Sequence, residues 1–158
     1  VKLYGAGAFR AAVAEKRELA LDAVRRVAAL PGIVIDAPPD LSLFAFHLSW
    51  PGATRAEEDA ATRALMDRTT RRGRVMLTGC TAHGRFLGRV CVLSFRTHQP
   101  EIDALIEDMA AAIQEIDRTM IEQSDRARLR AIAVRAMRER GLEPTMPPAS
   151  AQLIWDWR

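Results

Sequence analysis

The stretch that decides the fold of this chain is Thr81-Ala-His-Gly-Arg-Phe-Leu-Gly-Arg-Val-Cys-Val-Leu-Ser-Phe-Arg-Thr-His98. Within it, residues 86–95 are rich in Val, Leu and Phe, and turn-forming residues bound them on both sides, a pattern typical of a buried strand. The run contains one interior charge, Arg89. Because an unpaired guanidinium is very unfavourable in an apolar interior, Arg89 must pair with a buried acid, for instance Asp36 or Glu101, or project towards a wet, anion-binding pocket.

Three further strands surround this one in the sequence. Residues 75–78 form the preceding strand, and the short link at residues 79–84 makes the two antiparallel neighbours. Upstream, residues 33–36 and 41–49 are separated by a Pro-Pro-Asp turn and predict a hairpin. In its second strand Phe44, Phe46 and Leu48 share one face at period two, which places His47 on the opposite face.

Three amphipathic helices complete the pattern. The first covers residues 8–30 and ends at Pro31-Gly32. The second runs over residues 55–72, where Thr54 and Glu57 form a capping box and Gly73 follows the last turn. The third begins near Pro100 and carries an apolar stripe to Met120. The prediction is an α+β, two-layer domain: an approximately four-stranded, mainly antiparallel sheet with helices packed on one face, plus a C-terminal helical extension.

Several motifs occur in a characteristic order between residues 2 and 116. They are Leu3-Tyr4-Gly5, Gly7-Ala8-Phe9-Arg10, Leu43-Phe44-Ala45-Phe46-His47-Leu48, Gly73-Arg-Val-Met-Leu-Thr-Gly79, Gly84-Arg85-Phe86, Arg89-Val90-Cys91-Val92 and Arg96-Thr97-His98, followed by a helix that starts with Ile102-Asp103. Together they resemble the C-terminal small domain of the group II amino-acid decarboxylases, which depend on pyridoxal 5'-phosphate (PLP) and include the aromatic-L-amino-acid and glutamate decarboxylases. The resemblance implies a sheet whose second face lies towards a much larger cofactor-binding domain.

We therefore expect two regions, a decarboxylase-like small domain at residues 1–122 and an extension at residues 123–158. The extension contains six arginines between positions 126 and 140, and they spread around a helix, as on a solvated surface. It ends in an apolar tail with Trp155 and Trp157, which we expect to fold back on the domain or to dock on a partner. The chain starts with Val1 in what resembles the middle of a domain, so we expect a fragment, a processed product or a separately encoded piece.

Composition narrows the class of protein. The chain has 158 residues, of which 49% are hydrophobic and 27% are charged, as in an ordinary globular domain. A net charge of +3 with 6% aromatic residues makes nucleic-acid binding an unlikely function. Two cysteines give no disulfide framework, three scattered histidines give no metal site, and no segment resembles a membrane span or a secretory signal. We expect a cytoplasmic location.

The residues that PLP chemistry requires are missing from the sequence. The only lysines are Lys2 and Lys16, neither of them in the family's Asn-x-Asp-x-His-Lys setting, and no Gly/Ser-rich phosphate cup is present. We predict no catalytic residue, no cofactor-binding residue and no activity for the isolated chain. In the complete enzyme, the resemblance to glutamate decarboxylases implies that Arg89 extends towards the carboxylate of the substrate or product. His83 is a weaker candidate at the active-site entrance, and Gly88, where the family commonly has Leu, removes packing beside Arg89.

Two functions remain open. The first is a domain or subunit of a PLP-dependent decarboxylase, whose partner is the missing large PLP-binding domain; the resemblance also favours a homo-oligomer, specifically a dimer. The alternative is a non-catalytic interaction or oligomerisation module derived from that domain, which would use the bare sheet face and the two tryptophans of its tail.

Overall fold

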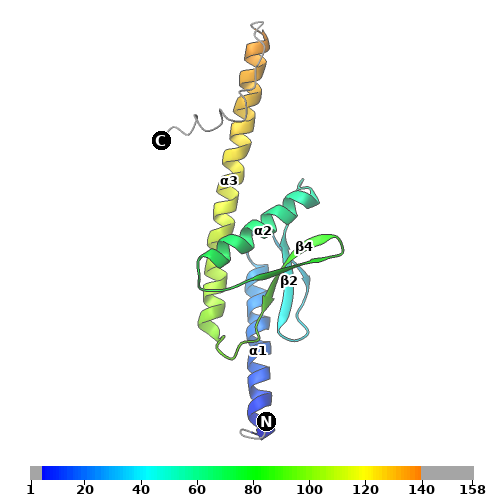
Figure 1. The fold of residues 1–158 in the computed structure, drawn as a ribbon, viewed down its shortest axis with the longest axis vertical. Helices are drawn as coiled ribbons and strands as arrows, with labels where there is room; N and C mark the ends of the chain where they lie inside the picture. The colour runs from blue at the N-terminus through cyan, green and yellow to red at the C-terminus, as the bar shows by residue number, and fades with distance from the viewer. Residues whose placement is uncertain (1–4, 140–158) are drawn as a thin grey trace. The chain divides into compact units, whose positions relative to one another are not determined.

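A computed structural model describes residues 5–139 (Figure 1). The predictions for Lys2 and for the tryptophan-containing tail lie outside these residues. The described part divides into two compact units, one ending at Asp117 and the other beginning at Arg118. Its elements, in chain order, are α1 (Gly5–Ala28), β1 (Ile33–Ala37), β2 (Leu43–Leu48), α2 (Arg55–Arg71), β3 (Thr78–Ala82), β4 (Arg85–Cys91) and α3 (Gln99–Glu139).

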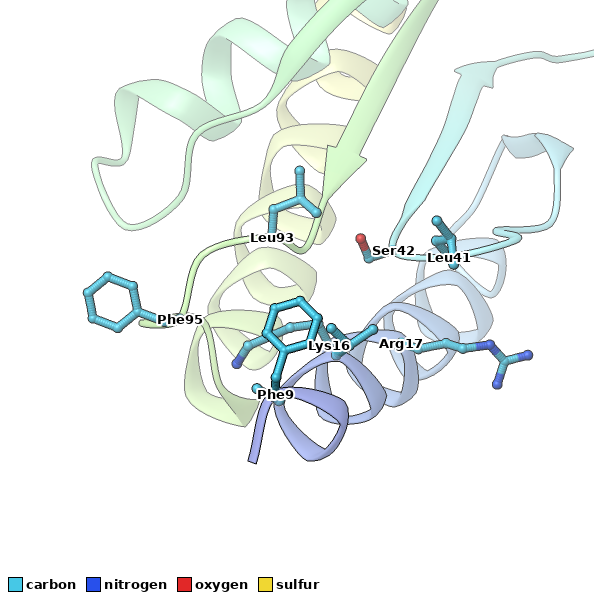
Figure 2. A pocket seen from close by; sticks show the side chains of 9 residues that line it. Phe9, Lys16, Arg17, Leu41, Ser42, Leu93 and Phe95 are labelled. Carbon is cyan, nitrogen blue, oxygen red and sulfur yellow. The ribbon is translucent and has the colours of Figure 1, made fainter. Parts of the chain in front are cut away.

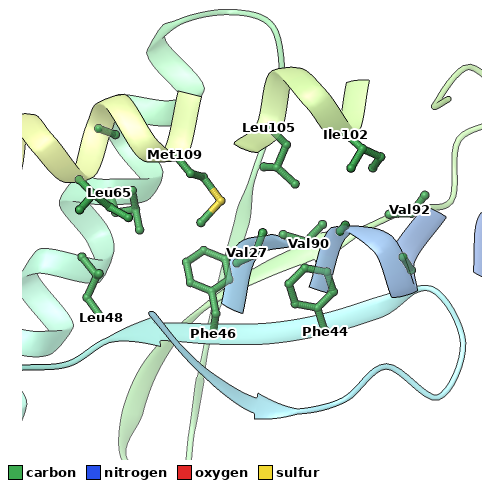
Figure 3. Packing of buried hydrophobic residues seen from close by; sticks show 14 of the residues in the cluster. Val27, Phe44, Phe46, Leu48, Leu65, Val90, Val92, Ile102, Leu105 and Met109 are labelled. Carbon is green, nitrogen blue, oxygen red and sulfur yellow. The ribbon is translucent and has the colours of Figure 1, made fainter. Parts of the chain in front are cut away.

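The four strands form one antiparallel sheet in the order β1-β2-β4-β3, so both predicted strand pairs are confirmed. Phe44 lies opposite Val90, and Phe46 lies opposite Gly88. This register turns the two phenylalanines towards the helices, where they pack with side chains of α1, α2 and α3 (Figure 3). The predicted α+β arrangement is confirmed.

The β3–β4 hairpin differs from the predicted one in both strands. The strand expected at residues 75–78 is Thr78–Ala82, and the strand expected to reach residue 95 ends at Cys91. His83 and Gly84, with φ of 51° and 70°, form the turn, and two positive φ values are the mark of a tight type I′ hairpin turn. The strands therefore continue up to these two residues, and the six-residue link expected at 79–84 does not exist.

Two glycines of the sheet lie beneath aromatic rings. A Cβ on Gly88 would come within 2.5 Å of Phe46 Cζ, and a Cβ on Gly79 would collide with the ring of Phe86. A ring above a strand glycine restores the apolar cover that the glycine itself lacks. The expectation that Gly88 removes packing is therefore wrong, because Phe46 occupies that space.

The ends of α2 follow the sequence signals. The Thr54 hydroxyl accepts a hydrogen bond from the Glu57 amide at 3.3 Å, and Glu57 Oε2 accepts one from the Thr54 amide at 2.8 Å. These bonds from Thr54 hold the pKa of Glu57 below its usual value. After the last turn, Gly73 takes a φ of 77°. The predicted capping box is confirmed, and it fixes where α2 starts beside β4.

Charged and polar side chains connect α1 to the first turns of α3. Arg26 Nη1 donates to Asp103 Oδ1 at 2.6 Å and to Asp22 Oδ2 at 3.4 Å, while Gln99 Nε2 donates to Asp22 Oδ2 at 3.1 Å. The hydrogen bond from Gln99, helped by Arg26, lowers the pKa of Asp22. Arg26 is the main cause of the lowered pKa of Asp103.

This network should make part of the stability depend on pH. A carboxylate whose pKa is lower in the folded than in the unfolded state stabilises the fold above its unfolded pKa, and the contribution is lost as the pH falls through the folded value. We expect Arg26→Gln to lower the urea midpoint at about pH 7 and to differ less from the wild type at about pH 2.5, because the contribution of Asp22 and Asp103 is lost progressively below the unfolded pKa of aspartate, about 3.9. Arg71→Gln, which breaks the exposed pair with Asp67, is the control and should change little at either pH. An equal Arg26→Gln effect at both pH values would contradict the prediction.

Helix α3 continues without a break to Glu139, so the helix expected from residue 124 is its continuation. In the second unit, the side chains at residues 121–133 are exposed, among them Ile121, Leu129 and Ile132. The second unit's longer apolar side chains are thus not covered by the described residues.

Candidate functional site

The face of the sheet that points away from Phe44 and Phe46 carries the candidate residue Arg89. Along β4, the register places Arg89 between Ala45 of β2 and Thr78 of β3. Neighbouring positions of the same face belong to Leu43, His47, Leu87 and Cys91. We call this surface, with Asp36 and Val34 of β1 at its border, the open face.

Arg89 has a buried nitrogen without a hydrogen-bond partner. Its side chain is half-buried, and Nε finds no acceptor among residues 5–139. The two acids expected as structural partners are otherwise engaged: Asp36 Oδ2 lies 3.0 Å from His47 Nδ1, and Glu101 Oε2 accepts the His98 amide at 2.7 Å. Because buried donors are normally satisfied, the unpaired Nε is unusual, and it shows that no acid among residues 5–139 pairs with Arg89 through this nitrogen.

His47 lies on the open face, as the alternation in β2 predicted. It is only 7% exposed, and Asp36 holds its Nδ1 across the β1–β2 pair. His47 was not among the site residues predicted from the sequence. The sequence did contain a signal for it. His47 alternates with the buried apolar residues of β2, so it lies on the opposite sheet face, and Arg89 needs a partner on that face.

His83 occupies the tip of the β3–β4 hairpin. It is exposed and has a positive φ. Five residues, Gly84 of the turn and four of β4, lie between it and Arg89, a distance of up to about 20 Å at the usual rise per residue. The structure does not bring these two candidate residues together.

An apolar groove lies beside the first half of α1 (Figure 2). It has a volume of about 300 Å³. Large hydrophobic side chains line it and remain exposed to solvent: Phe9, Val13, Leu41, Leu93 and Phe95. From the sequence, Phe9 was expected only as part of an amphipathic helix and residues 93 and 95 as part of a buried strand, so this groove was not predicted.

Lys16 borders the groove but does not present a free amine to it. The residue is 9% exposed, and its Nζ donates to the carbonyl oxygen of Thr97 at 2.6 Å and pairs with Glu15 at 3.2 Å. Hydrogen bonds from His98 and Lys16 lower the pKa of Glu15. A lysine that forms a Schiff base needs an uncommitted amine beside a phosphate-binding loop. The residues around Lys16 do not fit PLP.

Two further features concern the described part of the chain: metal sites and helices that could cross a membrane. No group of three or more His, Cys, Asp or Glu side chains is arranged to hold a metal ion there. None of the helices within residues 5–139 is long and apolar enough to cross a membrane.

Comparisons with known proteins identify the fold. No family model and no curated protein matches this chain. Solved structures do match. Rhodiola rosea 4-hydroxyphenylacetaldehyde synthase is 24% identical with a TM-score of 0.68, over 73% of this chain and 25% of that one. Catharanthus roseus tryptophan decarboxylase, solved with L-tryptophan, is 20% identical with a TM-score of 0.62, over 70% of this chain and 24% of that one.

A more distant match is the glutamate decarboxylase domain of a Vibrio parahaemolyticus protein, with 16% identity and a TM-score of 0.54, over 66% of this chain and 22% of that one. Oryza sativa TDC, solved with PLP and tryptamine, has a TM-score of 0.66 at 18% identity. The predicted resemblance is confirmed at the level of the fold. This chain spans about a quarter of the length of these structures.

Proposed function

We propose that this chain is the small domain of a PLP-dependent amino-acid decarboxylase, present as a fragment or a separate subunit. It supplies Arg89 to the substrate side of the active site, while the cofactor lysine belongs to a large PLP-binding domain. The observation that carries the proposal is the unpaired, buried Nε of Arg89 on the open face of a sheet whose fold occurs in solved decarboxylases. The complete enzyme is expected to be a cytoplasmic homo-oligomer.

Arg89 suits recognition of a carboxylate. A guanidinium donates two parallel hydrogen bonds to the two oxygens of a carboxylate, which fixes both the position and the orientation of the ligand. In decarboxylation, bound PLP withdraws electrons from the bond between Cα and the carboxylate. The role of this chain is then to bind and orient the amino acid, and His83 is expected to contribute only at the entrance.

The apolar groove is the expected contact with the large domain. Phe9, Leu93 and Phe95 are 59%, 70% and 77% exposed, more than a domain of this size is expected to leave open to water without a partner. In the solved tryptophan decarboxylase, about three quarters of the chain lies outside the part that matches this one. A covering domain therefore accounts for the groove.

The test is reconstitution with the PLP-binding large domain that belongs with this chain. We expect decarboxylase activity only from the combined parts, and Arg89→Lys should lower kcat/KM at least tenfold, mainly through KM, because an ammonium cannot bind a carboxylate through two parallel bonds. Arg71→Lys, on the exposed face of α2, is the matched control. Unchanged kinetics for Arg89→Lys would refute its role on the substrate side.

The alternative, a non-catalytic interaction module, is favoured by the same exposed groove. It predicts that the chain binds its partner through Phe9, Leu93 and Phe95 while no combination of parts decarboxylates an amino acid. Complex formation without activity would support this alternative.

A further inference from the structure

The open face has a single carboxylate within the described strands, Asp36. It stands at an irregularity of β1, where the register shifts between Ile35 and Ala37. Its side chain is 32% exposed. Across the sheet, Ala37 of β1 pairs with Ala45 of β2, and Ala45 pairs with Arg89 of β4.

Asp36 is close enough to reach Arg89. Two strand spacings, about 10 Å, separate the backbone of its chain neighbour Ala37 from that of Arg89, and Ala45 lies between them in the register. An extended arginine and an aspartate can together cover this distance. The sequence analysis expected such a pair as a structural explanation for Arg89.

The structure contains a different pair. His47 Nδ1 lies 3.0 Å from Asp36 Oδ2, and the His47 side chain is 8% exposed. A buried imidazole N–H needs an acceptor, so His47 gains from holding this carboxylate. Arg89 is left with its Nε unpaired among the described residues.

We propose that His47 is a positioning residue of the Arg89 site: it retains Asp36, so that Arg89 stays free for the carboxylate of a ligand. This inference rests on the proposed function of Arg89 in binding a carboxylate. An internal carboxylate that reaches Arg89 competes with any free ligand, because tethering gives it an effective concentration of the order of millimolar or more. His47 removes that competitor.

The other charged groups at this border do not replace His47. Arg85, on the same face of β4, pairs with Glu58 at 2.9 Å, and Glu58 also accepts the Ser49 hydroxyl at 2.5 Å. Glu58 therefore binds Arg85 and Ser49 near the start of α2 and is not a partner of Asp36 or Arg89. Among the described residues of the open face, only Asp36 can act as the internal competitor, and the side chain that holds it is His47.

The experiment uses the full chain, labelled with ¹⁵N, and follows the Arg89 Nε–H signal by NMR. Glutarate, which has two carboxylates and no amine, is the probe. His47→Leu should move the Arg89 signal before any probe is added, as Asp36 turns to Arg89, and should weaken glutarate binding at least tenfold. His47→Leu with Asp36→Asn should restore both the signal and the affinity to within about twofold of the wild type, because the competitor is gone.

The outcomes separate this inference from the proposed function. If the wild type shows no glutarate-dependent change at Arg89, the role of Arg89 in binding carboxylates fails, while the displaced signal in His47→Leu and its return in the double variant still support retention of Asp36. An Arg89 signal that His47→Leu leaves in place overturns the inference, even if glutarate binds. Should His47→Leu not fold, His47→Phe serves as the second variant with the same expected results.

Discussion

Replacing Phe46 by alanine is expected to lower the free energy of unfolding by about 3–5 kcal/mol, the largest loss of stability that we predict for a single substitution. Phe46 is fully buried, packs beneath α3 and covers Gly88 of the neighbouring strand (Figure 3). Its loss removes apolar contacts and opens a cavity that the sheet cannot close. Urea unfolding followed by circular dichroism measures the effect.

Phe95→Ala is the matched control. Phe95 is 77% exposed, so the same change of residue type should alter the free energy of unfolding by no more than about 0.5 kcal/mol. Gly88→Ala gives a second check. It should destabilise the wild type, because its Cβ meets the Phe46 ring, but not the Phe46→Ala variant, where the ring is absent. Additive effects of the two substitutions would contradict the packing described here.

Phe95→Asp is expected to weaken binding of the large domain at least a hundredfold, because it places a charge in the apolar groove where a covering domain would exclude water. The stability of the free chain should hardly change, since the side chain is exposed. Binding of the purified large domain, measured by calorimetry, gives the dissociation constant.

Leu129→Asp is the control for charge alone. Leu129 is 65% exposed in the second unit and does not line the groove. We expect this variant to bind like the wild type. If Phe95→Asp binds equally well, the groove is not the contact with the large domain, and another surface must be sought.

Local signals in the sequence predicted most of the framework. The capping box of Thr54 and Glu57 is a pattern of neighbouring residues and needs no tertiary information. The two hairpins followed from short links between apolar runs, and the period-two pattern of β2 placed His47 on the correct face. These features depend on residues close in the chain, which is why the sequence alone predicts them.

The end of β4 could not be predicted in the same way. Leu93 and Phe95 continue the apolar run, and hydrophobicity alone does not distinguish a side chain that enters the core from one that lines an exposed groove. The position of the β3–β4 turn could not be predicted either, because His83 adopts a positive φ only as part of a tight hairpin with Gly84.

Contacts across strands limited the prediction of the candidate site. Arg89 was expected to find a partner, and Asp36 was a reasonable choice by charge. Which of His47 and Arg89 holds Asp36 depends on the register of three strands and on the irregularity in β1. The ring of Phe46 above Gly88 likewise depends on the β2–β4 register.

The strand order β1-β2-β4-β3 has a consequence for aggregation. Both outer strands leave one row of backbone groups without a partner strand among the described residues. In β1 that row is interrupted by the register shift and followed by Pro38 and Pro39, features that discourage pairing with another chain. The segment Thr78–Ala82 of β3 has neither a charge nor a proline, so intermolecular strand addition in concentrated solutions should start at β3, and a lysine substituted for Thr81 should suppress it.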